Sequence, residues 1–62
     1  MNPEELFLAA TRAADTAEHV RALSEDSLRE LYGYCEDNNI QSDVWSDCLI
    51  EIGRRFLEGR KF

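Results

Sequence analysis

Apolar residues recur every three to four positions along most of this chain, a spacing typical of amphipathic helices. The first such stretch has a clear beginning, because Asn2 can cap a helix and Pro3 suits its first position. One face then collects mostly small apolar residues: Leu6, Ala10, Ala13, Ala17 and Val20. We therefore predict a helix over residues 3–22.

A second helix is predicted over residues 25–37. Ser24 followed by the acids Glu25 and Asp26 is a good N-terminal signal, and Asn38 and Asn39 can end the helix, since Asn tolerates the left-handed conformation. Its apolar stripe is Leu28, Leu31, Tyr32 and Cys35. No Gly or Pro separates this helix from the first, so one kinked helix from Pro3 to Asp37 is the alternative.

A third helix is predicted over residues 43–58, with Ser42 as its cap and Gly59 as its stop. The predicted inner side carries Val44, Trp45, Cys48, Leu49, Ile52 and Phe56. Ile50 and Leu57 widen the apolar arc to roughly 240° of the helical wheel, and the remaining polar strip is narrow. That strip consists of Asp47, Glu51, Arg54 and Glu58. Such a helix is either central to the fold or carries a second contact surface.

The predicted fold is all-α: one small three-helix domain spanning residues 1–62, in which the first helix is followed by an antiparallel hairpin of the other two. A hairpin centred near residues 41–42 places Cys35 opposite Cys48, as buried thiols or, alternatively, as a disulfide. A single core in a chain of this size rarely supplies more than about 3–5 kcal/mol. Completion of the domain by dimerisation is therefore part of the prediction.

The apolar runs, the first residues and the cysteine count together predict where in the cell this protein is located. No apolar run approaches the ~20 residues of a membrane span, and the chain opens with acids where a secretory signal has bases. Two cysteines are too few for a disulfide-rich secreted scaffold. We expect a cytoplasmic protein with reduced thiols and no membrane span.

The net charge of −6 is unevenly placed, since residues 24–52 contain eight acids and one base. This argues against direct nucleic-acid binding, which depends on Lys and Arg, and a helix-turn-helix would present acids from its recognition helix to DNA. The acidic charge of residues 24–52 is compatible with a basic protein partner. The candidate acidic surface is Glu36, Asp37, Asp43 and Asp47. The basic tail over residues 54–62 could touch phosphate or an anionic membrane, or only compensate the helix dipole.

No catalytic, cofactor or metal site is predicted. The loop over residues 37–43 resembles a calcium loop in its alternating oxygens, but Ser42 replaces the required Gly and Cys48 the bidentate Glu. Two cysteines and His19 are too few for a zinc site. Nucleophilic catalysis would need a thiol beside His19, whereas both thiols are expected in the core and His19 on the polar side. We expect a protein that is not an enzyme.

The remaining signal is surplus apolar surface outside the predicted core stripes. It comprises Leu8, Tyr34, Ile50, Leu57 and Phe62. Scattered exposed apolar residues are normal, but this many in a small chain suggest a contact face. Two hypotheses follow: a homodimeric adaptor or regulator acting through protein contacts, or a monomeric acidic inhibitor that occupies a basic or nucleic-acid-binding site on another protein.

Overall fold

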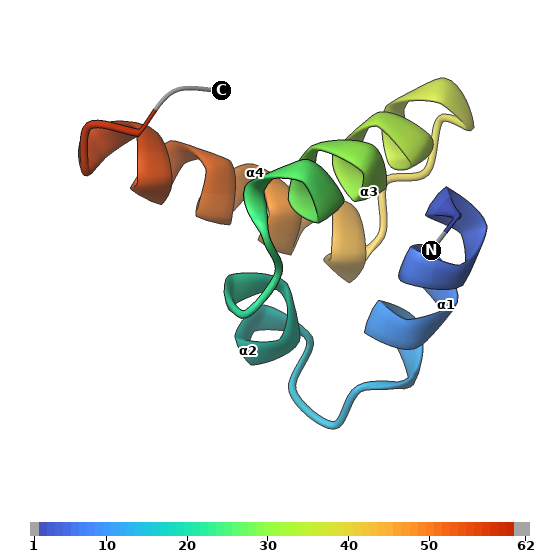
Figure 1. The fold of residues 1–62 in the computed structure, drawn as a ribbon. Coiled ribbons are helices and arrows are strands. Elements are labelled where there is room, and N and C mark those ends of the chain that lie inside the picture. The colour runs from blue at the N-terminus through green and yellow to red at the C-terminus, as the bar shows by residue number, and fades with distance from the viewer. Residues whose placement is uncertain (1, 61–62) are drawn as a thin grey trace.

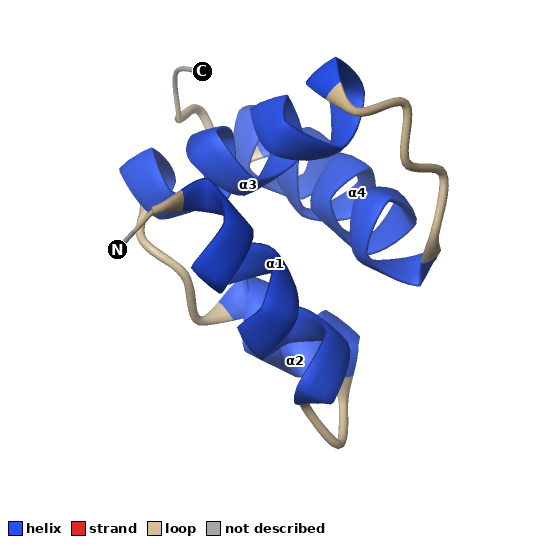
Figure 2. Cartoon of the chain, turned by 90° about the vertical axis from the view of Figure 1, so that its right-hand side faces the viewer, coloured by secondary structure: helices blue, strands red, loops and turns tan. Residues whose placement is uncertain are grey.

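The structure, a computed structural model, describes residues 2–60 and consists of helices and loops throughout that range (Figures 1 and 2). The helices are α1 (Pro3–Arg12), α2 (Thr16–Arg21), α3 (Glu25–Asp37) and α4 (Asp43–Leu57). The predicted all-α class is confirmed, with four helices in place of three. Within residues 2–60, no helix has both the length and the apolar character that crossing a membrane requires.

The prediction of a single helix over residues 3–22 is wrong, because the chain leaves the helical conformation after Arg12. Ala13 has extended backbone, with ψ of 143°, and the Asp15 carboxylate accepts a hydrogen bond from the backbone nitrogen of Glu18 at 3.1 Å. Asp is among the best N-capping residues, so α2 has its own start signal. A continuous helix of this length would measure about 30 Å, as long as the largest extent of the whole molecule, 29 Å. The break instead lets each half pack on a different helix.

The predicted start and end of α3 are both confirmed, and each is fixed by local hydrogen bonds. The Ser24 hydroxyl accepts from the backbone nitrogen of Ser27 at 3.2 Å. At the other end Asn39 is left-handed, with φ of 54°, and the Ile40 nitrogen donates to the Cys35 carbonyl at 2.8 Å. This is a Schellman ending. The chain therefore breaks before α3, and the single kinked helix is excluded.

The bounds of α4 agree with the prediction, since it ends one residue before the predicted position. Ser42 occupies the capping position but makes no side-chain capping hydrogen bond. Gly59 has φ of 88°, and the nitrogen of Arg60 donates to the Arg55 carbonyl at 3.0 Å. The positive φ explains why glycine stands at this turn.

The helices pack as two crossed pairs. In Figure 1, α1 and α2 descend to the turn at residues 13–15 and form a V below α3 and α4. α1 packs mainly on α3 and α2 mainly on α4, while α3 and α4 contact each other. α4 runs back past the beginning of α3 (Figure 1). Its final turns therefore extend beyond α3 (Figure 1), where Arg55 contacts the end of α2.

A small apolar core lies where the four helices meet. Its buried members are Leu6, Ala10, Val20, Leu28, Leu31, Cys35, Val44 and Cys48. Half-buried residues such as Phe7 and Trp45 pack around it. Two alanines of the face predicted for the first helix are not in this core, since Ala13 is only half-buried and Ala17 is exposed. The reason is that the break at Asp15 turns α2 to a new direction.

Candidate interaction surface

The inner side of α4 is not the side that its apolar pattern predicts. The buried positions are Val44, Cys48, Glu51 and Arg55, which follow one another at helical spacing on a single face. Glu51 and Arg55, with exposures of 5% and 3%, are the two buried charged residues in the described chain. The sequence pattern predicts Glu51 in the narrow polar strip and Arg55 in the basic tail over residues 54–62. The helix is therefore rotated relative to that prediction.

Glu51 is held by two arginines of its own helix. Its Oε2 accepts from Nε of Arg55 at 2.7 Å and from Nη2 of Arg54 at 2.8 Å, and its Oε1 accepts from Nε of Arg54 at 3.0 Å. The hydrogen bonds from Arg54 lower the pKa of Glu51 most, burial opposes them, and the Arg55 bond lowers it further, to about 2. The carboxylate is therefore ionised at neutral pH.

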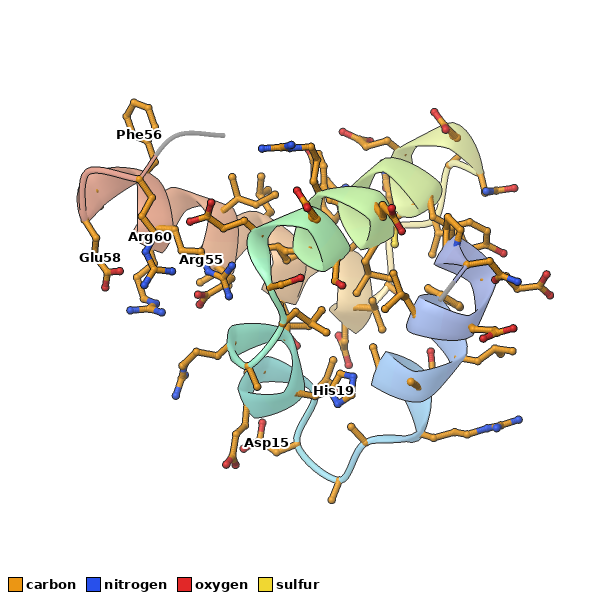
Figure 3. All side chains as sticks on the ribbon, in the orientation of Figure 1. Asp15, His19, Arg55, Phe56, Glu58 and Arg60 are labelled. Carbon is orange, nitrogen blue, oxygen red and sulfur yellow. The ribbon has the colours of Figure 1, made fainter. Side chains whose placement is uncertain are left out.

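Arg55 also ties α4 to the end of α2. Its Nη2 donates to the carbonyl of Arg21 at 3.0 Å and to the carbonyl of Leu23 at 2.6 Å. The last carbonyls of a helix have no partner within it. The guanidinium therefore supplies a donor to Arg21, the last residue of α2, and a second one to Leu23 in the connection to α3. Figure 3 shows Arg55 directed from α4 toward α2. This contact fixes the rotation of α4 about its axis.

The opposite side of α4 is consequently apolar and faces solvent. The exposures of its large residues are Leu49 45%, Ile50 66%, Phe56 67% and Leu57 86%. Gly53, also exposed, lies between them, and Phe56 stands away from the body of the molecule (Figure 3). We call these five residues the outer face of α4. Leu49 and Phe56 correct the prediction, which had placed them on the inner side.

The five predicted interface residues do not form one surface. Ile50 and Leu57 lie on the outer face of α4, whereas Leu8 is exposed on α1. Tyr34 is half-buried, and its ring packs on Phe7 with centroids 5.6 Å apart. Its position off the α3 stripe therefore serves packing within the chain. Phe62 lies outside the described residues.

The predicted acidic residues lie on both sides of the loop over residues 38–42. Glu36 and Asp37 end α3, Asp43 begins α4, and all three are exposed, whereas Asp47 is half-buried. The Tyr32 hydroxyl donates to Oε1 of Glu36 at 2.7 Å. The carboxylates are thus close in the chain but exposed to solvent, where salt screens their field.

Both thiols are buried and free, as predicted for inert core cysteines. Cys35 and Cys48 have no exposed surface. Burial, then the neighbouring Cys35 and Asp47, raise the pKa of the Cys48 thiol to about 12, and burial also raises the pKa of Cys35. The thiolate is the reactive form of cysteine, so both groups are unsuited to nucleophilic chemistry in the folded state.

His19 and one surface groove complete the features with possible chemistry. His19 is half-buried on α2 and lies between α2 and α1 (Figure 3), which corrects its predicted exposed position. A shallow, open groove of about 250 Å³ lies between α1, α2 and the start of α4. Its lining is Phe7, Thr11, Thr16, Ser42, Asp43 and Val44. The groove offers hydroxyls and one carboxylate as polar groups.

Comparison of the chain with protein-family models, with curated proteins and with solved structures finds no match.

Proposed function

We propose that this protein is a small adaptor or regulator without catalytic activity, which acts through protein contacts and forms a homodimer through the outer face of α4. The observation that carries the proposal is the rotation of α4. Its charged residues Glu51 and Arg55 are buried, while Ile50, Phe56 and Leu57 face solvent. An exposed apolar patch rimmed by polar residues is the usual mark of a protein contact site.

The size of the patch supports self-association. The exposed fractions of Leu49, Ile50, Phe56 and Leu57 together equal about two and a half side chains, which corresponds to about 4–8 kcal/mol per chain on burial. Two chains contribute twice this amount, against a cost of association of about 4–15 kcal/mol. The gain is thus of the size needed to offset the cost. Small domains also commonly use a second copy to complete their stability.

We expect Ile50→Glu or Leu57→Glu to convert a dimer into a folded monomer, because each substitution places a charge within the apolar contact. Light scattering over a wide range of protein concentration measures the mass, and circular dichroism checks the helix content. Leu8→Glu is the matched control, since Leu8 is an exposed leucine on α1 and its substitution should leave the dimer intact. A wild-type protein that stays monomeric at every concentration would contradict the proposal.

The second candidate function, an acidic inhibitor of a basic protein, is favoured by the exposed carboxylates of Glu36, Asp37 and Asp43. It predicts binding to a basic polypeptide that weakens with salt. Charge reversal at these three positions would abolish that binding, while Leu57→Glu would leave it unchanged. Binding lost with Leu57→Glu but not with charge reversal would instead favour the outer face of α4.

A further inference from the structure

The groove between α1, α2 and the start of α4 is a surface separate from the outer face of α4. Val44 lines the groove, whereas Gly53 belongs to the outer face. Gly53 follows Val44 by nine residues, so at 100° per residue the two point in opposite directions from the helix axis. A homodimer formed through the outer face therefore leaves the groove open in both copies.

The groove has the size of one side chain. Its volume of about 250 Å³ lies below the roughly 300–1,000 Å³ of pockets that enclose a small-molecule ligand. Its apolar lining consists of Phe7, which is half-buried, and Val44, which is buried. The side chain that fits such a groove has an apolar stem and a polar end, because the other lining residues are polar. These are Thr11, Thr16, Ser42 and Asp43.

The polar groups of the groove present hydrogen-bond acceptors. The hydroxyl of Thr11 donates to the carbonyl of Phe7 at 2.9 Å, and that of Thr16 donates to the carbonyl of Ala10 at 3.4 Å. Each hydroxyl proton is thus used within the chain, while the oxygen can still accept. The carboxylate of Asp43 is exposed and has no hydrogen bond or ion pair within the described part of the chain. These groups suit a ligand that donates hydrogen bonds.

The charge around the groove favours a cation. Residues 36–47 contain four acids and no base. α2 and α4 both begin beside the groove, and the positive end of a helix dipole opposes a cation. Each of these ends carries an acid, however: Asp15 caps α2, and Asp43 lies in the first turn of α4. The full charge of a carboxylate outweighs the roughly half charge of a helix end, so the groove repels anions and attracts cations.

We propose that the groove binds one basic side chain, a lysine or an arginine, of a partner protein. This inference rests on the proposed adaptor function and names the chemistry of its partner. The methylene stem lies along Phe7 and Val44, as the stems of long basic side chains do on apolar surfaces. The charged end donates to the carboxylate of Asp43 and to the threonine hydroxyl oxygens. A homodimer presents two such grooves, one from each copy.

Titration of the full chain with short peptides tests the site, with the backbone amide signals followed by NMR. The probes are acetylated and amidated Gly-Gly-Lys-Gly-Gly and its arginine analogue, in about 0.15 M salt so that long-range attraction is screened. Both peptides should shift the signals of Thr11, Thr16 and Val44. The control peptide carries norleucine, which keeps the apolar stem but has no charge, and should leave these signals unchanged.

Two variants and a control locate the binding. Asp43→Asn should weaken binding of the lysine peptide about 5-fold, the upper range for an exposed ion pair. Asp37→Asn should leave the affinity nearly unchanged, since Asp37 is an exposed acid of the same acidic stretch but does not line the groove. Thr11→Lys keeps the test valid if Asp43→Asn folds poorly. Thr11 is exposed on α1, and a new ammonium group there should abolish binding by repelling the basic peptide.

Each outcome decides for or against the groove. Shifts confined to the groove, seen with both basic peptides and reduced by Asp43→Asn but not by Asp37→Asn, support it. Equal weakening by the two substitutions, or unchanged binding to Thr11→Lys, overturns the groove and leaves the acidic surface as the binding site. Shifts of equal size with the norleucine peptide overturn the basic occupant. No shift with either basic peptide at ~10 mM, which half-saturates even a ~10 mM site, overturns the inference and leaves the homodimer to the Leu57→Glu test.

Discussion

Arg55→Ala is expected to lower the free energy of unfolding by about 3–5 kcal/mol, the usual cost of removing one partner of a buried ion pair. The Glu51 carboxylate loses its buried partner, and the carbonyls of Arg21 and Leu23 lose their donor. Since a core of this size rarely supplies more than about 3–5 kcal/mol, most molecules of the variant should be unfolded at room temperature. Urea denaturation followed by circular dichroism measures the change.

Arg54→Ala is the matched control for this prediction. Arg54 also binds Glu51 but is 44% exposed, and in its absence Arg55 still pairs with the buried carboxylate, so its loss should cost less than the loss of Arg55. The double variant Glu51→Leu with Arg55→Met should recover part of the stability, because no buried charge is left unpaired. If Arg55→Ala and Arg54→Ala have equal, small effects, then the buried pair does not hold α4 against α2.

Acid is expected to destabilise the protein through Glu51. Its folded pKa of about 2 lies below 4.5, the ordinary pKa of a Glu side chain, so the folded state favours the ionised form. The resulting stability is fully present above pH ~4.5 and is lost as the pH falls toward ~2. The difference in pKa corresponds to about 3 kcal/mol. Urea denaturation at a series of pH values between 6 and 2 (roughly the range over which the linkage acts) should show this decline.

The control is Glu51→Gln, which cannot ionise at this position. We expect this variant to be less stable than the wild type near neutral pH but to lose less stability on acidification. Both proteins should carry Leu57→Glu, so that dissociation of a dimer does not add to the free energy of unfolding. Parallel pH profiles for the two proteins would show that another group, and not Glu51, controls the acid sensitivity.

Apart from the break at residues 13–15, the ends of the helices could be predicted from the sequence because their signals are local. Ser24 accepts a hydrogen bond three residues away, and Asn39 and Gly59 take the left-handed conformation that their types tolerate. The break before α2 also has a local signal, in which Asp15 caps at Glu18. The alanines on both sides of Asp15 also favour a continuous helix. Local preference alone therefore did not decide between one continuous helix and a break before α2.

The sequence by itself determined the helical class, the bounds of α3 and α4 and the presence of apolar surface in excess of one core. The direction in which α4 faces was decided only by the tertiary structure. An apolar arc of roughly 240° allows several rotations with similar burial. The rotation of α4 is fixed because Arg55 binds Glu51 on its own helix and also the carbonyls of Arg21 and Leu23. These two carbonyls lie more than 30 positions away from Arg55 in the chain. Because these polar partners satisfy the buried charges, Glu51 and Arg55 face inward and Ile50, Phe56 and Leu57 are left exposed.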